Sequence, residues 1–288
     1  MSGQKRSDTD EMTFAEHIDA LRPHLVRGVL AILALAVAAF LCKGLLIDGV
    51  LFGPMSAGFP TNRLLVWMAG LAGIEFVPGI ERMQLINTAM AGQFNLHLKI
   101  SMVAAFCIGF PYLLWELWRF ARPALTEREL RGCRRFVFYV SAGFFAGLLF
   151  GYFIIAPLTI GFLSQYSVSE QVTNMIDVGS YLSTVLNVSI ACAVVFQLPL
   201  LVYFLTRMGL VSPDFLRRYR RHALVALAIL SAVITPPDVF SMILVLLPLF
   251  GLYEYSIRIS ERTLRRSSGT EGTTTEGEID SERTKEAS

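Results

Sequence analysis

The sequence predicts an all-α polytopic membrane protein with six transmembrane helices and with both termini on the same side of the bilayer. Three observations lead to this fold class. Of the 288 residues, 54% are hydrophobic and only 17% are charged, whereas about a quarter of the residues in a typical soluble domain are charged. The hydrophobic residues gather in long runs with few charges. The arginine residues gather between alternate runs.

Composition and cysteine spacing exclude several other classes. The formal net charge is only +2, from 25 basic and 23 acidic residues, whereas a nucleic-acid-binding surface needs a strong basic surplus. The four cysteines, Cys42, Cys107, Cys133 and Cys192, have no CxxC spacing. They therefore indicate neither a disulfide framework nor a metal site. The polar, mixed-charge first 20 residues are unlike a cleavable signal peptide.

Four apolar runs are long enough to cross a membrane. A helix rises about 1.5 Å per residue, so about 20 residues cover a hydrocarbon core of ~30 Å. The runs are Leu25–Ile47, Ile100–Trp118, Phe136–Leu158 and Tyr181–Leu205. The charged residues within them, including Lys43 and Glu116, lie near the ends, where we expect long side chains to reach the interface.

The segment Ala223–Tyr253 predicts two further spans, both short. It is divided by Thr235-Pro236-Pro237-Asp238, a combination that ends a helix and forms a turn. The segment holds 31 residues, whereas two full crossings need about 20 each. We therefore expect two short C-terminal spans in a locally thinned bilayer.

Residues 49–98 are predicted to form an extracytoplasmic loop with one or two helices in the membrane interface. The apolar stretch Leu64–Val77 within this loop could be a seventh span. However, it is short, contains Glu75 and ends at Pro78-Gly79. A seventh span would also place the basic loops on opposite sides of the membrane.

The basic residues give the orientation. They gather in the N-terminal segment, between the second and third runs, between the fourth and fifth, and after the sixth, whereas segments 159–180 and 236–238 contain none. Because basic residues stay in the cytoplasm, both termini are expected there. Of the 25 basic residues, only four then lie on the outer side: Lys43, Arg63, Arg82 and Lys99.

This topology divides the chain into three parts. Residues 1–24 form a cytoplasmic N-terminal segment, and residues 25–259 form the six-span membrane domain. Residues 260–288 are rich in Ser, Thr, Gly and Glu and are expected to be a disordered cytoplasmic tail. Within the third run, Gly143, Gly147 and Gly151 form a face of small residues that favours close packing within the chain over a dimer contact.

No catalytic constellation is visible. The sequence has no HExxH, GxSxG or P-loop motif, and His17, His24, His97 and His222 lack metal-ligand spacing. We expect neither an enzyme nor a cofactor. A solute transporter or channel is the alternative, but it normally shows ionisable groups near the bilayer midplane or internal repeats. The deepest strongly polar group is Gln197, whose packing against a neighbouring helix is the simpler interpretation.

Two acids stand out in the first basic loop. Glu127 and Glu129 lie among six arginines. One interpretation is a solvated, charge-balanced turn. The other is a carboxylate that binds a cationic ligand, because guanidinium–carboxylate contacts are bidentate and strong.

Four motifs, in order along the chain, resemble those of the TatC family, the multispan receptors of the twin-arginine protein translocase. The first resembles HLxELR, the second P-x-x-x-Y-Q-x-W-x-F-x-x-P-[GA]-L-Y-x-x-E, and the third F-E-x-P. The fourth resembles a distinctive family stretch between two short spans. In this chain they are His17-Ile18-Asp19-Ala20-Leu21-Arg22, Pro111 to Phe120 with Pro123-Ala124-Leu125 and Glu129, Phe196-Gln197-Leu198-Pro199, and Thr235-Pro236-Pro237-Asp238-Val239-Phe240.

The resemblance implies a receptor for the signal peptides of folded exported proteins in the bacterial cytoplasmic (inner) membrane. The two signal arginines need carboxylates, and the family position falls on Glu129, near Glu127. The resemblance also implies TatA-type and TatB-type single-span partners and self-association. The other matched positions are Arg22 in the signal-binding site, Phe120 and Pro123 in the loop, Gln197 at the partner contact, and Pro54, Pro236, Pro237 and Asp238 in the outer loops.

Three positions depart from the family pattern. The glutamate of HLxELR is Ala20 here, which removes one carboxylate of the implied site. The neighbouring Asp19 is a candidate substitute, although adjacent residues on a helix point about 100° apart. The tyrosine of the loop signature is Thr126, and Met242 stands where relatives can carry a polar residue.

Overall fold

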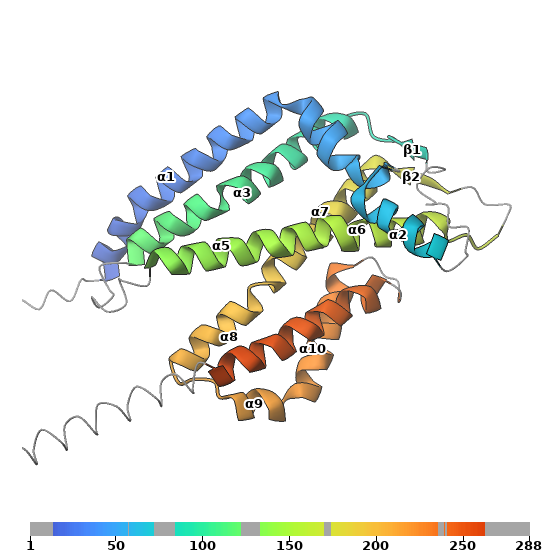
Figure 1. Cartoon of the computed structure of the whole chain (residues 1–288). Helices are drawn as coiled ribbons and strands as arrows, with labels where there is room; N and C mark the ends of the chain where they lie inside the picture. The colour runs from blue at the N-terminus through green and yellow to red at the C-terminus, as the bar shows by residue number, and fades with distance from the viewer. Residues whose placement is uncertain are drawn as a thin grey trace, which may run out of the picture. The chain divides into compact units, whose positions relative to one another are not determined.

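The computed structural model describes residues 14–56, 58–71, 84–121, 133–169, 174–235, 239 and 241–262. Within these ranges, five helices are long and apolar enough to cross a membrane. They are Arg22–Leu41, Gly92–Phe120, Val137–Gln165, Val178–Thr206 and Ser241–Arg262 (Figure 1). They correspond to the first four predicted runs and the sixth, so the prediction of a mostly helical membrane protein is confirmed.

The fifth predicted span corresponds to α10 (Arg220–Ile234), a helix of 15 residues. At 1.5 Å per residue it is about 22 Å long, which is short of a hydrocarbon core of ~30 Å. Thr235 ends the helix by donating its backbone N–H and its hydroxyl to the Ser231 carbonyl. The short length predicted for this element is therefore confirmed.

The last helix, Ser241–Arg262, has 22 residues. The prediction of two short C-terminal spans is therefore wrong for the second of them. The helix continues beyond its apolar part because the polar side chains that follow have partners. Glu254 pairs with Arg220 at 2.6 Å, and Ser260 Oγ lies 2.8 Å from Thr206 Oγ1.

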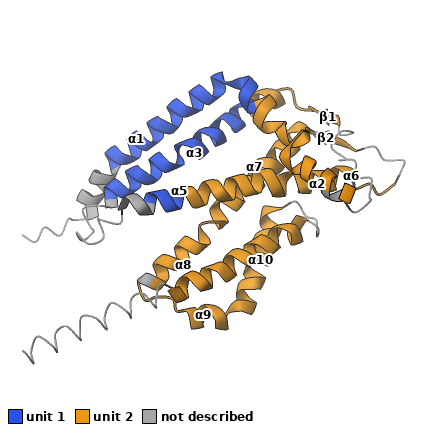
Figure 2. Ribbon diagram, viewed as in Figure 1, with its two compact units in different colours: residues 1–46, 97–141 blue, residues 47–96, 142–288 orange. Residues whose placement is uncertain are grey.

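The chain divides into two compact units, one of residues 1–46 and 97–141 and one of residues 47–96 and 142–288 (Figure 2). In the first unit, α1 (Phe14–Leu41) and α3 (Gly92–Ala121) run antiparallel. The rings of Phe40 and His97 stack with centroids 3.9 Å apart. Towards the other end, a Cβ added to Gly28 would lie 2.9 Å from Leu113, so the two helices touch along most of their length.

The second unit is built on the contact between α5 (Cys133–Phe150), π-helix η5 (Gly151–Ile155) and α7 (Val178–Val195). A Cβ added to Gly147 would lie 2.6 Å from the Cys192 carbonyl oxygen, and one added to Gly151 would lie 2.8 Å from Ser189 Cα. Only glycine allows the backbones to approach this closely. The predicted packing role of the glycine face within the chain is confirmed.

The core of the second unit continues from these helices to the C-terminal ones. Buried side chains from η5, α7, α10 and the last helix form one apolar cluster. Its members are Ile155, Val188, Cys192, Val195, Leu227, Val245 and Leu249. The cluster joins the short α10 to two longer helices and so holds it without a full crossing of its own.

The predicted outer loop begins within π-helix η1 (Leu45–Leu51) and contains the short 3-10 helix η2 (Gly53–Met55) and α2 (Pro60–Leu71). With 12 residues, α2 is about 18 Å long, shorter than a hydrocarbon core of ~30 Å. Tyr152 and Tyr181 donate their hydroxyls to the Val50 and Leu51 carbonyls at 2.5 and 2.8 Å. These bonds hold the end of η1 against η5 and α7 within the second unit.

One feature of the second unit was not predicted. Strand β1 (Gln84–Ile86) pairs in parallel with β2 (Met175–Asp177), with Gln84 opposite Met175 and Ile86 opposite Asp177. Each strand has only three residues, too few to show the alternation by which a strand is recognised. The pairing joins two segments that were both predicted to lie on the outer side.

Candidate functional site

A polar cluster lies where the N-terminal part of α1 meets the C-terminal part of α3. The carboxylate of Glu116 on α3 is its centre. His24 on α1 places Nδ1 2.6 Å from Glu116 Oε2. Tyr112, one turn before Glu116, donates its hydroxyl to Oε1 at 3.1 Å. Arg119, three residues after it, places Nη1 3.5 Å from Oε1.

The Glu116 carboxylate is buried: the residue is only 3% exposed. The expectation that this side chain reaches the membrane interface is therefore wrong. It turns against α1 instead, where His24 binds one of its oxygens, while Tyr112 of its own helix donates to the other. A buried carboxylate is costly unless it is paired and hydrogen-bonded, which these contacts achieve.

Arg119 lies on the exposed side of the cluster. The Arg119 side chain is 48% exposed, whereas that of His24 is 20% exposed. Its distance of 3.5 Å from the carboxylate exceeds the 2.7–2.9 Å or so of a strong charged hydrogen bond. The guanidinium is thus held loosely between the carboxylate and the surrounding medium.

Some of the predicted signal-binding residues lie on α1 and α3 close to this cluster, and the others lie outside the described residues. Arg22 lies on α1 two residues before His24 and is exposed, and Phe120 follows Arg119 on α3 and is half-buried. The backbone of Asp19 belongs to α1. The remaining ones, Pro123, Glu127 and Glu129, lie outside the described residues.

Gln197 lies at a break in the fourth predicted span, between the end of α7 and the start of α8 (Leu198–Arg207). Pro199, in the first turn of α8, lacks an N–H and is favoured at that place. Gln197 donates Nε2 to the Ala193 carbonyl at 3.4 Å, and a Cβ on Gly143 would lie 3.5 Å from the same nitrogen. The amide therefore faces α5 of its own unit.

Pro54, the predicted residue of the first outer loop, is fully buried in η2. Asn62 on α2 donates its Nδ2 to the Pro54 and Ser56 carbonyls at 3.0 and 2.9 Å. These bonds fold the loop back on itself and hold the proline inside it. The predicted turn residues Pro236, Pro237 and Asp238 lie outside the described residues.

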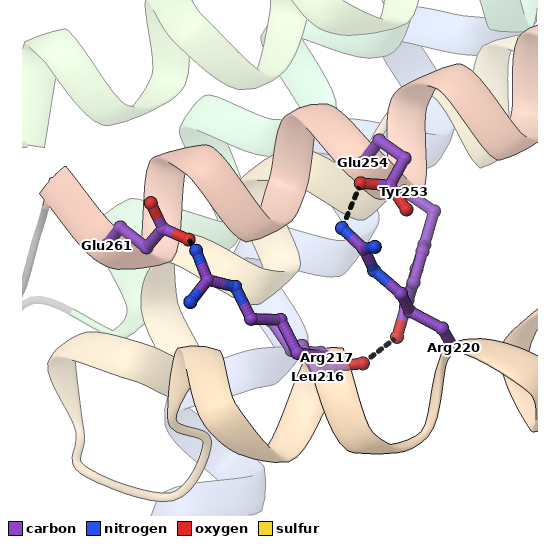
Figure 3. Close-up of polar contacts among 6 residues, drawn as sticks. All are labelled: Leu216, Arg217, Arg220, Tyr253, Glu254 and Glu261. Atoms are coloured by element: carbon purple, nitrogen blue, oxygen red, sulfur yellow. Dashed lines mark hydrogen bonds and ion pairs between the residues drawn. The ribbon is translucent and has the colours of Figure 1, made fainter.

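A second polar cluster ties the last helix to α9 (Pro213–Arg218) and to the start of α10 (Figure 3). Arg220 binds Glu254 at 2.6 Å, and Arg217 forms an ion pair with Glu261. Tyr253 donates its hydroxyl to the Leu216 carbonyl at 2.7 Å. Two carboxylates two turns apart on one helix thus bind two arginines of the same chain.

The sequence analysis missed the residues of both clusters. Glu116 was visible as a charge inside an apolar run, and His24 as one of four histidines, but nothing local pairs residues 92 positions apart. Neither cluster resembles a metal centre. In the part of the chain that the structure describes, no group of three or more His, Cys, Asp or Glu could hold a metal ion.

Comparison with protein families gives one match that covers most of the chain. The family model described as "Sec-independent protein translocase protein (TatC)" matches residues 16–248. A curated relative of that name from Blattabacterium sp. subsp. Periplaneta americana is 35% identical over 258 residues, covering 88% of this chain and 97% of its own length. The TatCy protein of Bacillus subtilis is 32% identical over 268 residues, covering 91% and 94%.

A solved structure matches the fold as well. It is the "Crystal Structure of Twin Arginine Translocase Receptor- TatC", with a TM-score of 0.67 and 27% sequence identity. The match covers 86% of this chain and 100% of that one. A second crystal structure, of the same receptor in DDM, gives the same TM-score with 28% identity.

Proposed function

Because the chain belongs to the TatC family of Sec-independent protein translocase components, we propose that it is the substrate receptor of a twin-arginine translocation system. It binds the twin-arginine signal peptides of folded precursors and nucleates the translocation complex. The observation that carries this proposal is the likeness to the twin-arginine receptor crystal structure over 86% of the chain.

The signal-binding site is proposed at the cytoplasmic ends of α1 and α3 and in the loop that follows α3. The signal carries two adjacent guanidinium groups, and carboxylates bind these in a bidentate manner. Glu129, Glu127 and Asp19 supply the carboxylates in this proposal. Arg22, Phe120 and Pro123 shape the surface around them.

The proposed topology has six spans, cytoplasmic termini and the three parts expected above: residues 1–24, the membrane domain 25–259 with its outer loop 49–98, and the tail 260–288. The boundary of the tail moves to residue 263, because residues 260–262 belong to the last helix. Contacts within each unit support this topology, because each joins segments predicted on the same side. The β1–β2 pair joins the two outer loops. The His24–Glu116 and Arg220–Glu254 contacts each join two cytoplasmic ends.

The proposed partners are TatA-type and TatB-type single-span proteins, together with further copies of this chain. Gln197 supports a docking place for a partner helix, since it lies at the α7–α8 break, where the helix backbone is interrupted. Pro54, Pro236, Pro237 and Asp238 are proposed to shape the outer loops. The proposed location is the bacterial cytoplasmic membrane, and the activity is transport without a catalytic step or a cofactor.

A six-span solute transporter or channel was the alternative from sequence. Family membership argues against it, because the relatives of this chain are components of a protein translocase. The experiment that separates the two is a pull-down from native membranes with an immobilised twin-arginine signal peptide and its twin-lysine counterpart. Retention on the arginine peptide alone supports the receptor, and equal retention on both, or none on either, rejects it.

A further inference from the structure

We propose that Glu116 is an arginine-binding residue of the receptor, and that in the resting protein Arg119 occupies the place of an incoming signal arginine. This inference rests on the proposed function, because it assigns one more carboxylate to the same site. It starts from a group that the sequence analysis left without a role: a buried carboxylate at the end of the second span.

The first argument is the geometry of the carboxylate. An ionised carboxylate accepts about four hydrogen bonds. In the described ranges, His24 and Tyr112 lie at 2.6 and 3.1 Å from its oxygens, and Arg119 lies at the longer distance of 3.5 Å. The position held by Arg119 is therefore filled by a guanidinium, but not tightly.

The second argument is the identity of that occupant. A guanidinium already stands next to Glu116 Oε1, so the site accepts the group that a signal arginine would bring. The Arg119 side chain is 48% exposed, so its own guanidinium stays solvated when it turns away, while His24 and Tyr112 remain beside the carboxylate. A second guanidinium that binds both oxygens in a bidentate manner would then be held more strongly than Arg119.

The third argument is the position of Glu116 relative to the missing family carboxylate. Ala20 and His24 are four residues, or about one helical turn, apart along α1. His24 is the residue of α1 that touches Glu116. The Glu116 carboxylate therefore contacts α1 about one helical turn after position 20. A carboxylate on α3 thus stands near the part of α1 in which the family resemblance implies one.

The test compares four variants of the full chain in native membranes, with a fluorescent twin-arginine signal peptide as the probe. Glu116→Gln keeps the shape of the side chain and removes its charge. We expect it to weaken binding about tenfold or more, the usual effect of a lost charged hydrogen bond. Glu116→Asp, which keeps the charge, should retain more of the binding. Arg119→Gln removes the competitor and should tighten binding severalfold.

The matched control is Glu254→Gln. Glu254 is also a carboxylate bound to an arginine, Arg220 at 2.6 Å, but it lies outside the proposed site. We expect it to leave peptide binding unchanged, which shows that the loss at Glu116 is not a general effect of removing one negative charge.

If Glu116→Gln weakens peptide binding and Arg119→Gln strengthens it, Glu116 binds arginine and does not merely hold α1 and α3 together. If both variants weaken binding alike, or if neither changes it, the inference is overturned. If neither variant changes binding, but the protein still distinguishes the twin-arginine from the twin-lysine peptide, the proposed function stands without this inference. If Glu116→Gln fails to accumulate in the membrane, Arg119→Gln alone decides, because tighter binding supports competition and unchanged or weaker binding contradicts it.

Discussion

His24 Nδ1 lies 2.6 Å from Glu116 Oε2, and this contact joins α1 to α3 across 92 residues of sequence. The same two helices touch at their other ends through the stacked rings of Phe40 and His97. Between these two contacts the helices approach closely at Gly28 and Gly109. The antiparallel pair α1 and α3 thus has an aromatic contact at one end and a paired carboxylate at the other.

The close approach of η5 and α5 to α7 predicts a position that tolerates no side chain. Gly147→Ala adds a Cβ 2.6 Å from the Cys192 carbonyl oxygen, and overpacking of this kind costs about 1–3 kcal/mol. That cost exceeds the gain in helix propensity of up to ~1 kcal/mol. We expect a lower midpoint of thermal unfolding in detergent. Gly161→Ala is the matched control, because a Cβ there meets nothing within 4 Å; an equal effect of both would contradict the packing argument.

The hydrogen bonds from tyrosines to η1 predict that removing a single hydroxyl group lowers the stability of the protein. Tyr181 is 3% exposed, and its hydroxyl donates to the Leu51 carbonyl at 2.8 Å. Tyr181→Phe leaves that carbonyl without its donor, at a cost of about 1–3 kcal/mol. Urea or thermal unfolding should show the loss. The control is Tyr166→Phe, at a residue 62% exposed, which should change the stability little. A Tyr181→Phe protein as stable as the wild type would show that this hydrogen bond does not stabilise the outer loop.

The proposed topology predicts which side of the membrane reacts with a thiol reagent. Val168, 86% exposed, follows α6 (Ala156–Gln165), and Asp214 is exposed in α9. In a cysteine-free background, Val168→Cys should react with a membrane-impermeant maleimide in intact cells. Asp214→Cys should react only after the cells are opened. Labelling of both from the same side would disprove the assignment of sides.

The position of Gln197 predicts a loss of partner binding without a loss of fold. Gln197→Leu removes the amide at the α7–α8 break, and we expect it to abolish co-purification of a TatA-type partner. Asn187→Leu is the control on the same predicted span, at an exposed position of α7. Intact co-purification with Gln197→Leu would return this residue to a role in packing within the chain, where its amide bonds to the Ala193 carbonyl.

The long spans could be predicted because the thickness of the bilayer sets the length of an apolar run. The run Leu25–Ile47 overlaps the spanning part of α1, Arg22–Leu41, for this reason, although its last residues fall in η1. The run Tyr181–Leu205 likewise overlaps the pair α7 and α8. The length of a helix could not be predicted from the local sequence where contacts with distant residues determine it. The last helix runs to Arg262 because residues such as Glu254 have partners outside it.

The candidate site shows the same division. The first basic loop could be singled out because acids among arginines are visible in the sequence alone. The partner of Glu116 could not be predicted, because His24 lies 92 residues away. Several other polar residues near the span ends were equally good candidates. A charge within an apolar run does predict a partner, because burying it alone is costly, but it does not say which one.

The most direct test of the receptor function is photo-crosslinking of a labelled twin-arginine signal peptide to the full chain carrying Glu129→Gln. Removal of one charged partner of an arginine costs about 1.5–3 kcal/mol, which corresponds to about tenfold to a hundredfold in affinity. We predict at least a tenfold loss of crosslinking with Glu129→Gln and none with Asp214→Asn, an exposed acid of α9. Equal crosslinking in the wild type and in Glu129→Gln would contradict recognition of the signal arginines by the acids of this loop.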